Sequence, residues 1–185
     1  MQHKLHTQHS KSLVLNCFIM LVCSLFMLNS ATAKGRFKAK GVTTNAAGGI
    51  TSARASAASG QNGNGYMRTR GSTTNGQGQV SGGGSTVVKG QNGAGGRAGH
   101  YHADNQGNVN YSGAAAASGA NGQAATKGGF SRDANGNIRG SRSSTATANN
   151  GSSYYGNTTY DNNGVSHTQV CYNANGQEIS CPTKN

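Results

Sequence analysis

The stretch Asp104-Asn-Gln-Gly107-Asn-Val109 decides how the chain is expected to fold, because close copies of it recur along the sequence. In each copy an Asx residue precedes a Gly by three positions, and Val or Ile follows that Gly within two residues. The glycines of the five copies, at intervals of 30, 29, 29 and 28 residues, are Gly48, Gly78, Gly107, Gly136 and Gly164. Such regular spacing is typical of a repeat protein.

A second turn motif, built on Asn-Gly, alternates with the first and keeps the same period. Its glycines, at intervals of 30, 29 and 29 residues, are Gly63, Gly93, Gly122 and Gly151, and Gly176 closes one more Asn-Gly turn near the C-terminus. Asn-Gly and Asp-x-x-Gly provide the positive φ angles and Asx hydrogen bonds that tight turns require. We therefore expect a turn at each of these ten glycines.

The segments between the turns are about nine to ten residues long and rich in Thr, Ser, Val and Tyr, which is typical of strands. Residues 114–117 are four consecutive alanines, but Gly113 and Gly119 bracket them, so we interpret them as strand rather than helix. The sequence predicts an all-β fold of about four 29-residue strand–turn–strand units. These units form either a meander or a β-solenoid.

The composition excludes several common architectures. The chain has 30 Gly, no Trp and a formal net charge of +12, and no Leu follows Leu28. With so few large apolar side chains, core burial does not offset the conformational entropy of ordering the backbone. A helical bundle or a typical α/β enzyme is therefore excluded. Disorder of part of the chain is the alternative, because the composition is polar and Gly-rich.

The N-terminus has the pattern of an export signal. Lys4 and Lys11 precede the apolar stretch 13–28, and Ala31-Thr-Ala33 follows as a cleavage site. The stretch is shorter than the roughly 20 residues of a membrane-spanning helix, which favours a cleaved signal peptide at 1–33 over a retained anchor. We expect secretion to the cell surface or the medium, with the periplasm as the alternative.

The expected organisation after the signal peptide has three parts. A basic strand or arm covers 34–44, four Gly/Asn-rich repeats cover 45–160, and a half-repeat covers 161–185. Cleavage would leave two cysteines, Cys171 and Cys181, and an even pair in an exported chain predicts a disulfide, here across the Gly176 hairpin. Two free thiols are the alternative.

Exported Gly/Asn/Gln-rich chains with tandem strand–turn–strand units resemble bacterial surface-matrix and functional-amyloid proteins of the curli-subunit type. The resemblance covers roughly residues 42–180. The units here are longer and the chain is much more basic than in that family. The resemblance implies a β-repeat that assembles with copies of itself.

Catalytic groupings are missing from the sequence. The acidic residues are few and scattered, no nucleophile elbow is present, and no cofactor motif is found, so we expect no enzyme and no cofactor. His100 and His102 share one face of a strand and are weak candidates for Cu or Zn ligands, although a third ligand is not evident.

The basic residues are the main candidates for binding. An excess of cations attracts polyanions through counterion release, and here these would be extracellular DNA, acidic polysaccharide or lipopolysaccharide. The candidates are Lys34, Arg36, Lys38, Lys40, Arg68, Arg70, Arg132, Arg139 and Arg142. The simpler interpretation is that their charge keeps a β-rich chain soluble.

Three functions follow as hypotheses. The leading one is a secreted structural repeat protein that self-assembles as a cell-surface or biofilm-like matrix component. The second is a monomeric basic module that binds extracellular polyanions. The third is a small antimicrobial or metal-sequestering protein that uses His100 and His102.

Overall fold

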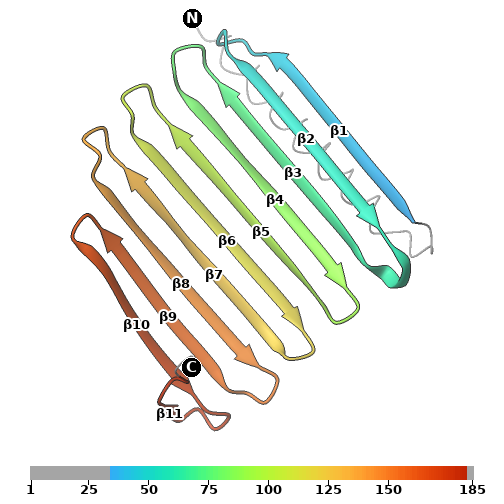
Figure 1. Ribbon diagram of the computed structural model, residues 1–185, viewed down its shortest axis with the longest axis vertical. Helices are drawn as coiled ribbons and strands as arrows, with labels where there is room; N and C mark the ends of the chain where they lie inside the picture. The colour runs from blue at the N-terminus through green and yellow to red at the C-terminus, as the bar shows by residue number, and fades with distance from the viewer. Residues whose placement is uncertain (1–33, 183–185) are drawn as a thin grey trace, which may run out of the picture. The chain divides into compact units, whose positions relative to one another are not determined.

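The computed structural model describes residues 34–182, so the expected signal peptide lies outside the described residues. These described residues form one antiparallel sheet of eleven strands whose spatial order equals their order in the sequence (Figure 1). The strands are β1 (Gly35–Thr44), β2 (Ile50–Ser59), β3 (Gly65–Thr74), β4 (Val80–Gly90), β5 (Gly93–Ala103), β6 (Val109–Gly119), β7 (Gly122–Arg132), β8 (Ile138–Ala148), β9 (Ser153–Asp161), β10 (Gly164–Tyr172) and β11 (Glu178–Ile179).

This arrangement decides between the two predicted architectures. Each strand pairs with the strand before and the strand after it, so the meander is confirmed and the β-solenoid is wrong. The alanine segment 114–117 lies inside β6, as a strand. A solenoid would need connections that wind around an enclosed core, whereas tight turns bring each strand back beside its predecessor.

The two turn motifs lie at the two opposite ends of the sheet, because successive strands run in opposite directions. All ten turn glycines have positive φ angles. In the longer turns Asn45, Asn75, Asp104, Asp133 and Asn173 play one role: Oδ1 accepts the backbone N–H groups of the residues two and four positions on, at 2.9–3.1 Å. The Asx oxygen thus accepts backbone N–H groups that the tight turn would otherwise leave without an acceptor.

Neighbouring turns at one end of the sheet are also bonded to each other. The N–H of Ala120 donates to the carbonyl of Asn92 at 3.1 Å, and the N–H of Asn149 donates to that of Asn121 at 3.2 Å. At the other end, the N–H of Ala134 donates to Oδ1 of Asn108 at 2.9 Å. A constant period is needed for these contacts, because they join residues almost one repeat apart.

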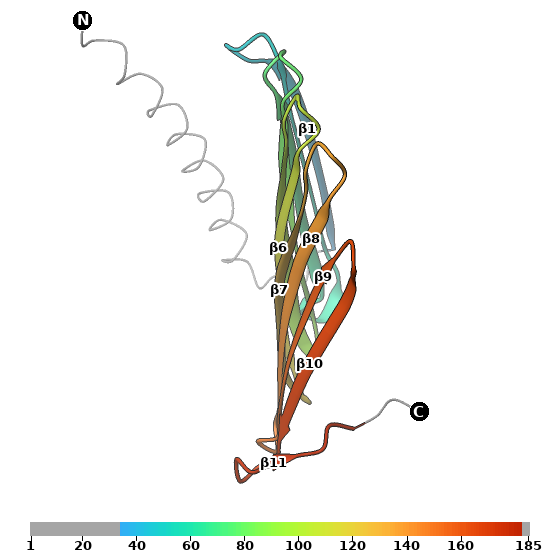
Figure 2. The same cartoon turned by 90° about the vertical axis from the view of Figure 1, so that its left-hand side faces the viewer.

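The sheet is a single layer, which Figure 2 shows edge-on. Among the described residues Cys171 is the only buried hydrophobic side chain, with 5% of its surface exposed. Stability therefore depends on the backbone ladders and on cross-strand side-chain pairs. Hydroxyl pairs bridge neighbouring strands, such as Thr69 Oγ1 with Ser85 Oγ at 2.8 Å and Ser52 Oγ with Ser72 Oγ at 2.9 Å.

The C-terminal end of the sheet is held by a covalent bond. Cys171 of β10 and Cys181 form a disulfide, with Cα atoms 5.2 Å apart, which confirms the predicted pairing. The bond spans the β10–β11 hairpin, in which Cys171 lies opposite Ile179.

Among the residues that the structure describes, no helix has the length and apolar character needed to span a membrane.

Candidate binding face and sheet edges

Cations gather on one face of the sheet. Directly opposite residues of a ladder share a face, so the registers assign every strand residue to one of two faces. Nine of the twelve Lys and Arg residues in the strands lie on the face that we call the cationic face. These are Arg36, Lys38, Lys40, Arg54, Arg68, Arg70, Arg97, Arg132 and Arg142.

The sequence analysis found most of this set. Seven of its polyanion candidates lie on the cationic face, together with Arg54 and Arg97. Arg139 lies on the opposite face, and Lys34 precedes β1. On the opposite face Gly, Ala, Ser and Thr predominate, and its strand cations are Lys89, Lys127 and Arg139.

The cationic face carries no carboxylate in the described strands. Asp104 and Asp133 lie in turns, and Asp161 and Glu178 belong to the opposite face. Lys40, Arg54 and Arg70 lie directly opposite one another on β1, β2 and β3. Like charges in this position destabilise a sheet, so the face is electrostatically suited to receive anions.

Two rows of residues cross the centre of the cationic face. The aromatic row, read across β1 to β10, is Val42, Ser52, Ser72, Gly82, Tyr101, Tyr111, Phe130, Gly140, Tyr160 and Val165. The glycine row beside it is Lys40, Arg54, Arg70, Gly84, Gly99, Gly113, Gly128, Arg142, Thr158 and His167.

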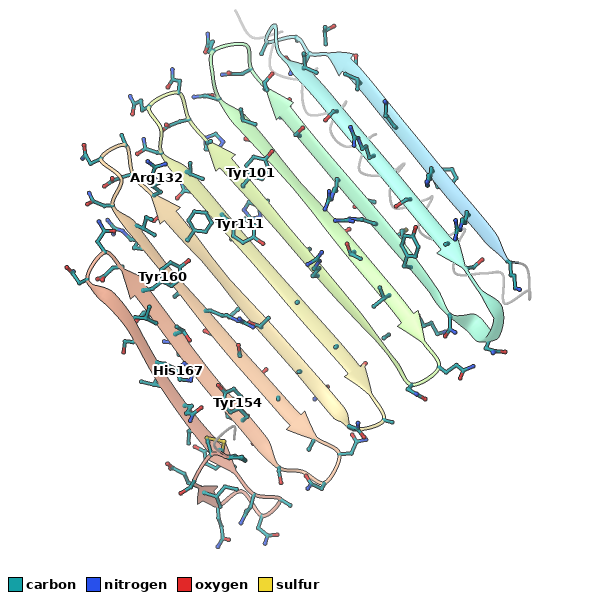
Figure 3. The ribbon with its side chains drawn as sticks, viewed as in Figure 1. Tyr101, Tyr111, Arg132, Tyr154, Tyr160 and His167 are labelled. Atoms are coloured by element: carbon teal, nitrogen blue, oxygen red, sulfur yellow. A yellow bond between two sulfur atoms is a disulfide. The ribbon has the colours of Figure 1, made fainter. Side chains whose placement is uncertain are left out.

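Tyrosine rings of the aromatic row lie over glycines (Figure 3). A Cβ at position 82 would lie 2.7 Å from both Cε1 and Oη of Tyr101, and a Cβ at position 140 would collide with the ring of Tyr160. Tyr111 Oη reaches over Gly99 and Gly113 in the same way, at 2.7 Å from each position. The glycines therefore allow the rings to lie close against the backbone, with ring surface exposed.

A shallow groove of about 1070 Å³ runs along these rows. Gly84, Gly99, Gly113 and Gly128 form part of its floor, and the aromatic rings of Tyr101, Tyr111, Phe130 and Tyr160 line one side. Arg97 and Thr126 line the other side, where Nε of Arg142 donates a hydrogen bond to Thr126 Oγ1 at 2.9 Å.

Both edges of the sheet are open among the strands that the structure describes. There β1 pairs only with β2, and β10 pairs with β9 and, at Cys171 and Tyr172, with β11. Residues 164–170 thus form the second edge. The most exposed large apolar side chains in the described chain are Val42 and Val165, at 64% and 75%, and they stand at the two ends of the aromatic row.

The turn hydrogen bonds determine which edge residues point outward. The N–H of Asn45 donates to the carbonyl of Gly49, and hydrogen-bonding direction alternates along a strand, so Lys38, Lys40 and Val42 direct their backbone groups away from β2. At the other edge the N–H of Asn173 donates to the carbonyl of Gln177, so the backbone groups of Cys171 point toward β11. By the same alternation, the backbone groups of Val165, His167 and Gln169 point away from β9. Both sets of residues belong to the cationic face.

The two histidines proposed as metal ligands lie on the face opposite the cations. The His102 ring bonds to Ser81 Oγ at 2.7 Å and the His100 ring to Ser112 Oγ at 3.1 Å. Within residues 34–182 no three His, Cys, Asp or Glu side chains come together as a metal site would need.

Two turn carboxylates have perturbed pKa values. The side-chain hydrogen bond from Asn108 lowers the pKa of Asp104 below its usual range, and that from Asn137 does the same for the pKa of Asp133. Backbone N–H donors of the same turns act in the same direction. Both carboxylates serve the turns, since each accepts the bonds that close its own loop.

Comparison with known proteins finds no matching family model, no matching curated protein and no matching solved structure. The function therefore has to be inferred from the chain's own geometry. The aromatic row, the glycine floor and the matched edge valines were not predicted from the sequence. The signal was present in period-two alternation within each segment, but only the registers show which residues of different strands stand side by side.

Proposed function

We propose that the protein is a secreted structural component whose copies join edge to edge into fibres at the cell surface or in an extracellular matrix. The observation that carries this proposal is the pair of open edges, β1 and β10, on a sheet that has no second layer within residues 34–182. An unpaired edge is a template for another strand. The secretory pattern at 1–33 supports export.

The strand count favours growth in one direction. Between the two open edges there are ten long strands, an even number, so β10 of one copy and β1 of the next can pair antiparallel while both copies keep the same orientation. The outward residues of both edges belong to the cationic face, so that face continues from copy to copy. A head-to-tail contact of this kind produces a fibre when its rotation does not close into a ring.

The edge side chains fit the same register. If the cross-strand rows continue straight into the next copy, Val165 lies opposite Val42, and the pair covers the two most exposed large apolar side chains of the described chain. Burying apolar surface stabilises by roughly 25 cal/mol per Å². The likeness to curli-type repeat proteins agrees with this mode of assembly, since backbone pairing there also joins the copies.

Negative-stain electron microscopy and light scattering of the purified protein test the proposal. A proline at Gln169 removes an N–H that points outward, so it should block fibre growth and leave the sheet folded. Proline at the neighbouring Thr168 removes an N–H directed at β9, so it should reduce the β signal in circular dichroism. A wild-type protein that stays monomeric at high concentration, or a Gln169→Pro variant that forms fibres as well as wild type, would overturn the proposal.

A further inference from the structure

The groove on the cationic face combines exposed aromatic rings, a glycine floor and guanidinium groups. We propose that it binds a linear acidic polysaccharide, whose sugar rings lie on the aromatic row and whose carboxylates meet the arginines. The groove lies within one copy of the chain. The proposal therefore goes beyond fibre formation, and its test does not require assembly.

The arrangement of the rings carries the first part of the argument. Tyr101, Tyr111 and Phe130 are on three neighbouring strands in direct register, and they are 38%, 42% and 37% exposed. The ring centroids of Tyr111 and Phe130 lie 5.8 Å apart and their planes differ by 28°, so the two rings are stacked. Strands are about 4.8 Å apart, a step close to the advance per sugar in an extended polysaccharide.

The glycine row makes the groove accessible to a polymer. Gly84, Gly99, Gly113 and Gly128 succeed one another on β4 to β7 without side chains of their own, and the Tyr111 hydroxyl reaches over Gly99 and Gly113. Glycine in a strand interior weakens the sheet and often marks a position that another group approaches closely. Four residues without side chains in one row leave a low path across the strands, between the aromatic row and Arg97 with Thr126.

Positive charge stands at both ends of this floor. Arg70 on β3 and Arg142 on β8 end the run of glycines, five strand spacings or about 24 Å apart. Arg97 lines the groove between them. Guanidinium groups bind carboxylates through two parallel hydrogen bonds. Because the described strands place no carboxylate on this face, the anions must come from the ligand.

The same features favour sugars over single-stranded nucleic acid. Sugar rings of an extended chain advance by a step close to the strand spacing, which matches aromatic rings on three successive strands. Single-stranded nucleic acid can stack its bases on the same rings, so the spacing of the strands and the carboxylate-binding guanidinium groups are what favour a sugar polymer. The geometry is thus better matched to a polysaccharide.

Fluorescence polarisation with a labelled oligogalacturonate long enough to span β3 to β8 measures the binding. The methyl-esterified oligomer keeps the rings and removes the charge, and labelled poly(dT) represents nucleic acid. We expect oligogalacturonate to bind at least about tenfold more tightly than its methyl ester, because charge-assisted hydrogen bonds are lost. Added salt should weaken the binding.

Two matched triple variants distinguish binding in the groove from attraction by the net charge of the protein. Replacing Arg70, Arg97 and Arg142 by Gln should weaken binding at least about tenfold. Replacing Lys89, Lys127 and Arg139 on the opposite face removes the same charge and should change it by less than about twofold. Tyr111→Thr should weaken binding several-fold, while Tyr111→Phe, which keeps the ring, should not.

Three results would overturn the proposal. Equal losses in the two triple variants would show attraction by net charge alone. Equal binding of the methyl ester would exclude a role for the arginines, and tighter binding of poly(dT) than of oligogalacturonate would assign the groove to nucleic acid. Circular dichroism of each variant keeps loss of folding distinct from loss of binding.

Discussion

Tyr101 lies directly opposite Gly82 across the β4–β5 ladder, and its ring occupies the space that a Cβ at position 82 would need. The pair shows how this sheet uses its glycines. A glycine has no side chain to pack, and a ring from the next strand can therefore lie against its backbone. Because the described part of the chain forms no second layer over this sheet, such contacts take the place of a core.

Gly82→Ala should destabilise the sheet by about 1–3 kcal/mol, because the new methyl group collides with the Tyr101 ring and with the carbonyl of Gly71. Urea unfolding followed by circular dichroism measures the change. Gly41→Ala in β1 is the matched control, since nothing lies within 4 Å of that position. It should leave stability unchanged or raise it by about 0.4–1 kcal/mol. Equal destabilisation by both variants would contradict this role for Gly82.

Charge at His167 should control fibre assembly, because straight continuation of the rows places it opposite Lys40 of the next copy. His167→Glu should lower the protein concentration needed for assembly and His167→Lys should raise it, each by about two- to fivefold, as expected of a cross-strand charge pair. Thioflavin fluorescence and sedimentation measure that concentration. The double variant His167→Lys with Lys40→Glu should assemble like His167→Glu, and a register without this pair would give no rescue.

Acid should loosen the turns that Asp104 and Asp133 close. The pKa of each carboxyl is lowered in the folded protein, so each contributes stability that is fully present above the unfolded value of about 3.8 and is lost as the pH falls through the lower folded value. Thermal unfolding at a series of pH values below 5 measures this loss. Asp104→Asn keeps an acceptor in the turn and should make the melting temperature less dependent on acid. An unchanged pH dependence in this variant would count against the assignment.

Removal of the disulfide should act locally. Replacing Cys171 and Cys181 together by Ala removes the bond across the β10–β11 hairpin and should cost about 2–3 kcal/mol, as expected for closure of a short loop. Hydrogen exchange should then show faster exchange in β11 and at the end of β10, with β2 to β8 still protected. Loss of protection across the whole sheet would show instead that the bond is needed for the fold.

The positions of turns and strands followed from the sequence, and the physical reason is local. A positive φ at Gly107 and the hydrogen bonds of Asp104 involve residues within one turn, so a short motif predicts them. The same reasoning placed the strand of residues 114–117 and the disulfide between Cys171 and Cys181, which are close in the chain. Arg68 and Arg70 share one face for an equally local reason, because residues two apart in a strand point to the same side.

Only the tertiary structure decided which distant residues stand together. Repeats of one period fit a meander as well as a solenoid, and turn geometry that returns each strand beside its predecessor selects the meander. A row across ten strands depends on every register between them, since a one-residue slip moves a side chain to the other face. The local motifs therefore determined the strand–turn repeat. The nine strand pairings between β1 and β10 together place Val42 and Val165 in one row, and they bring the rings, glycines and arginines to one face.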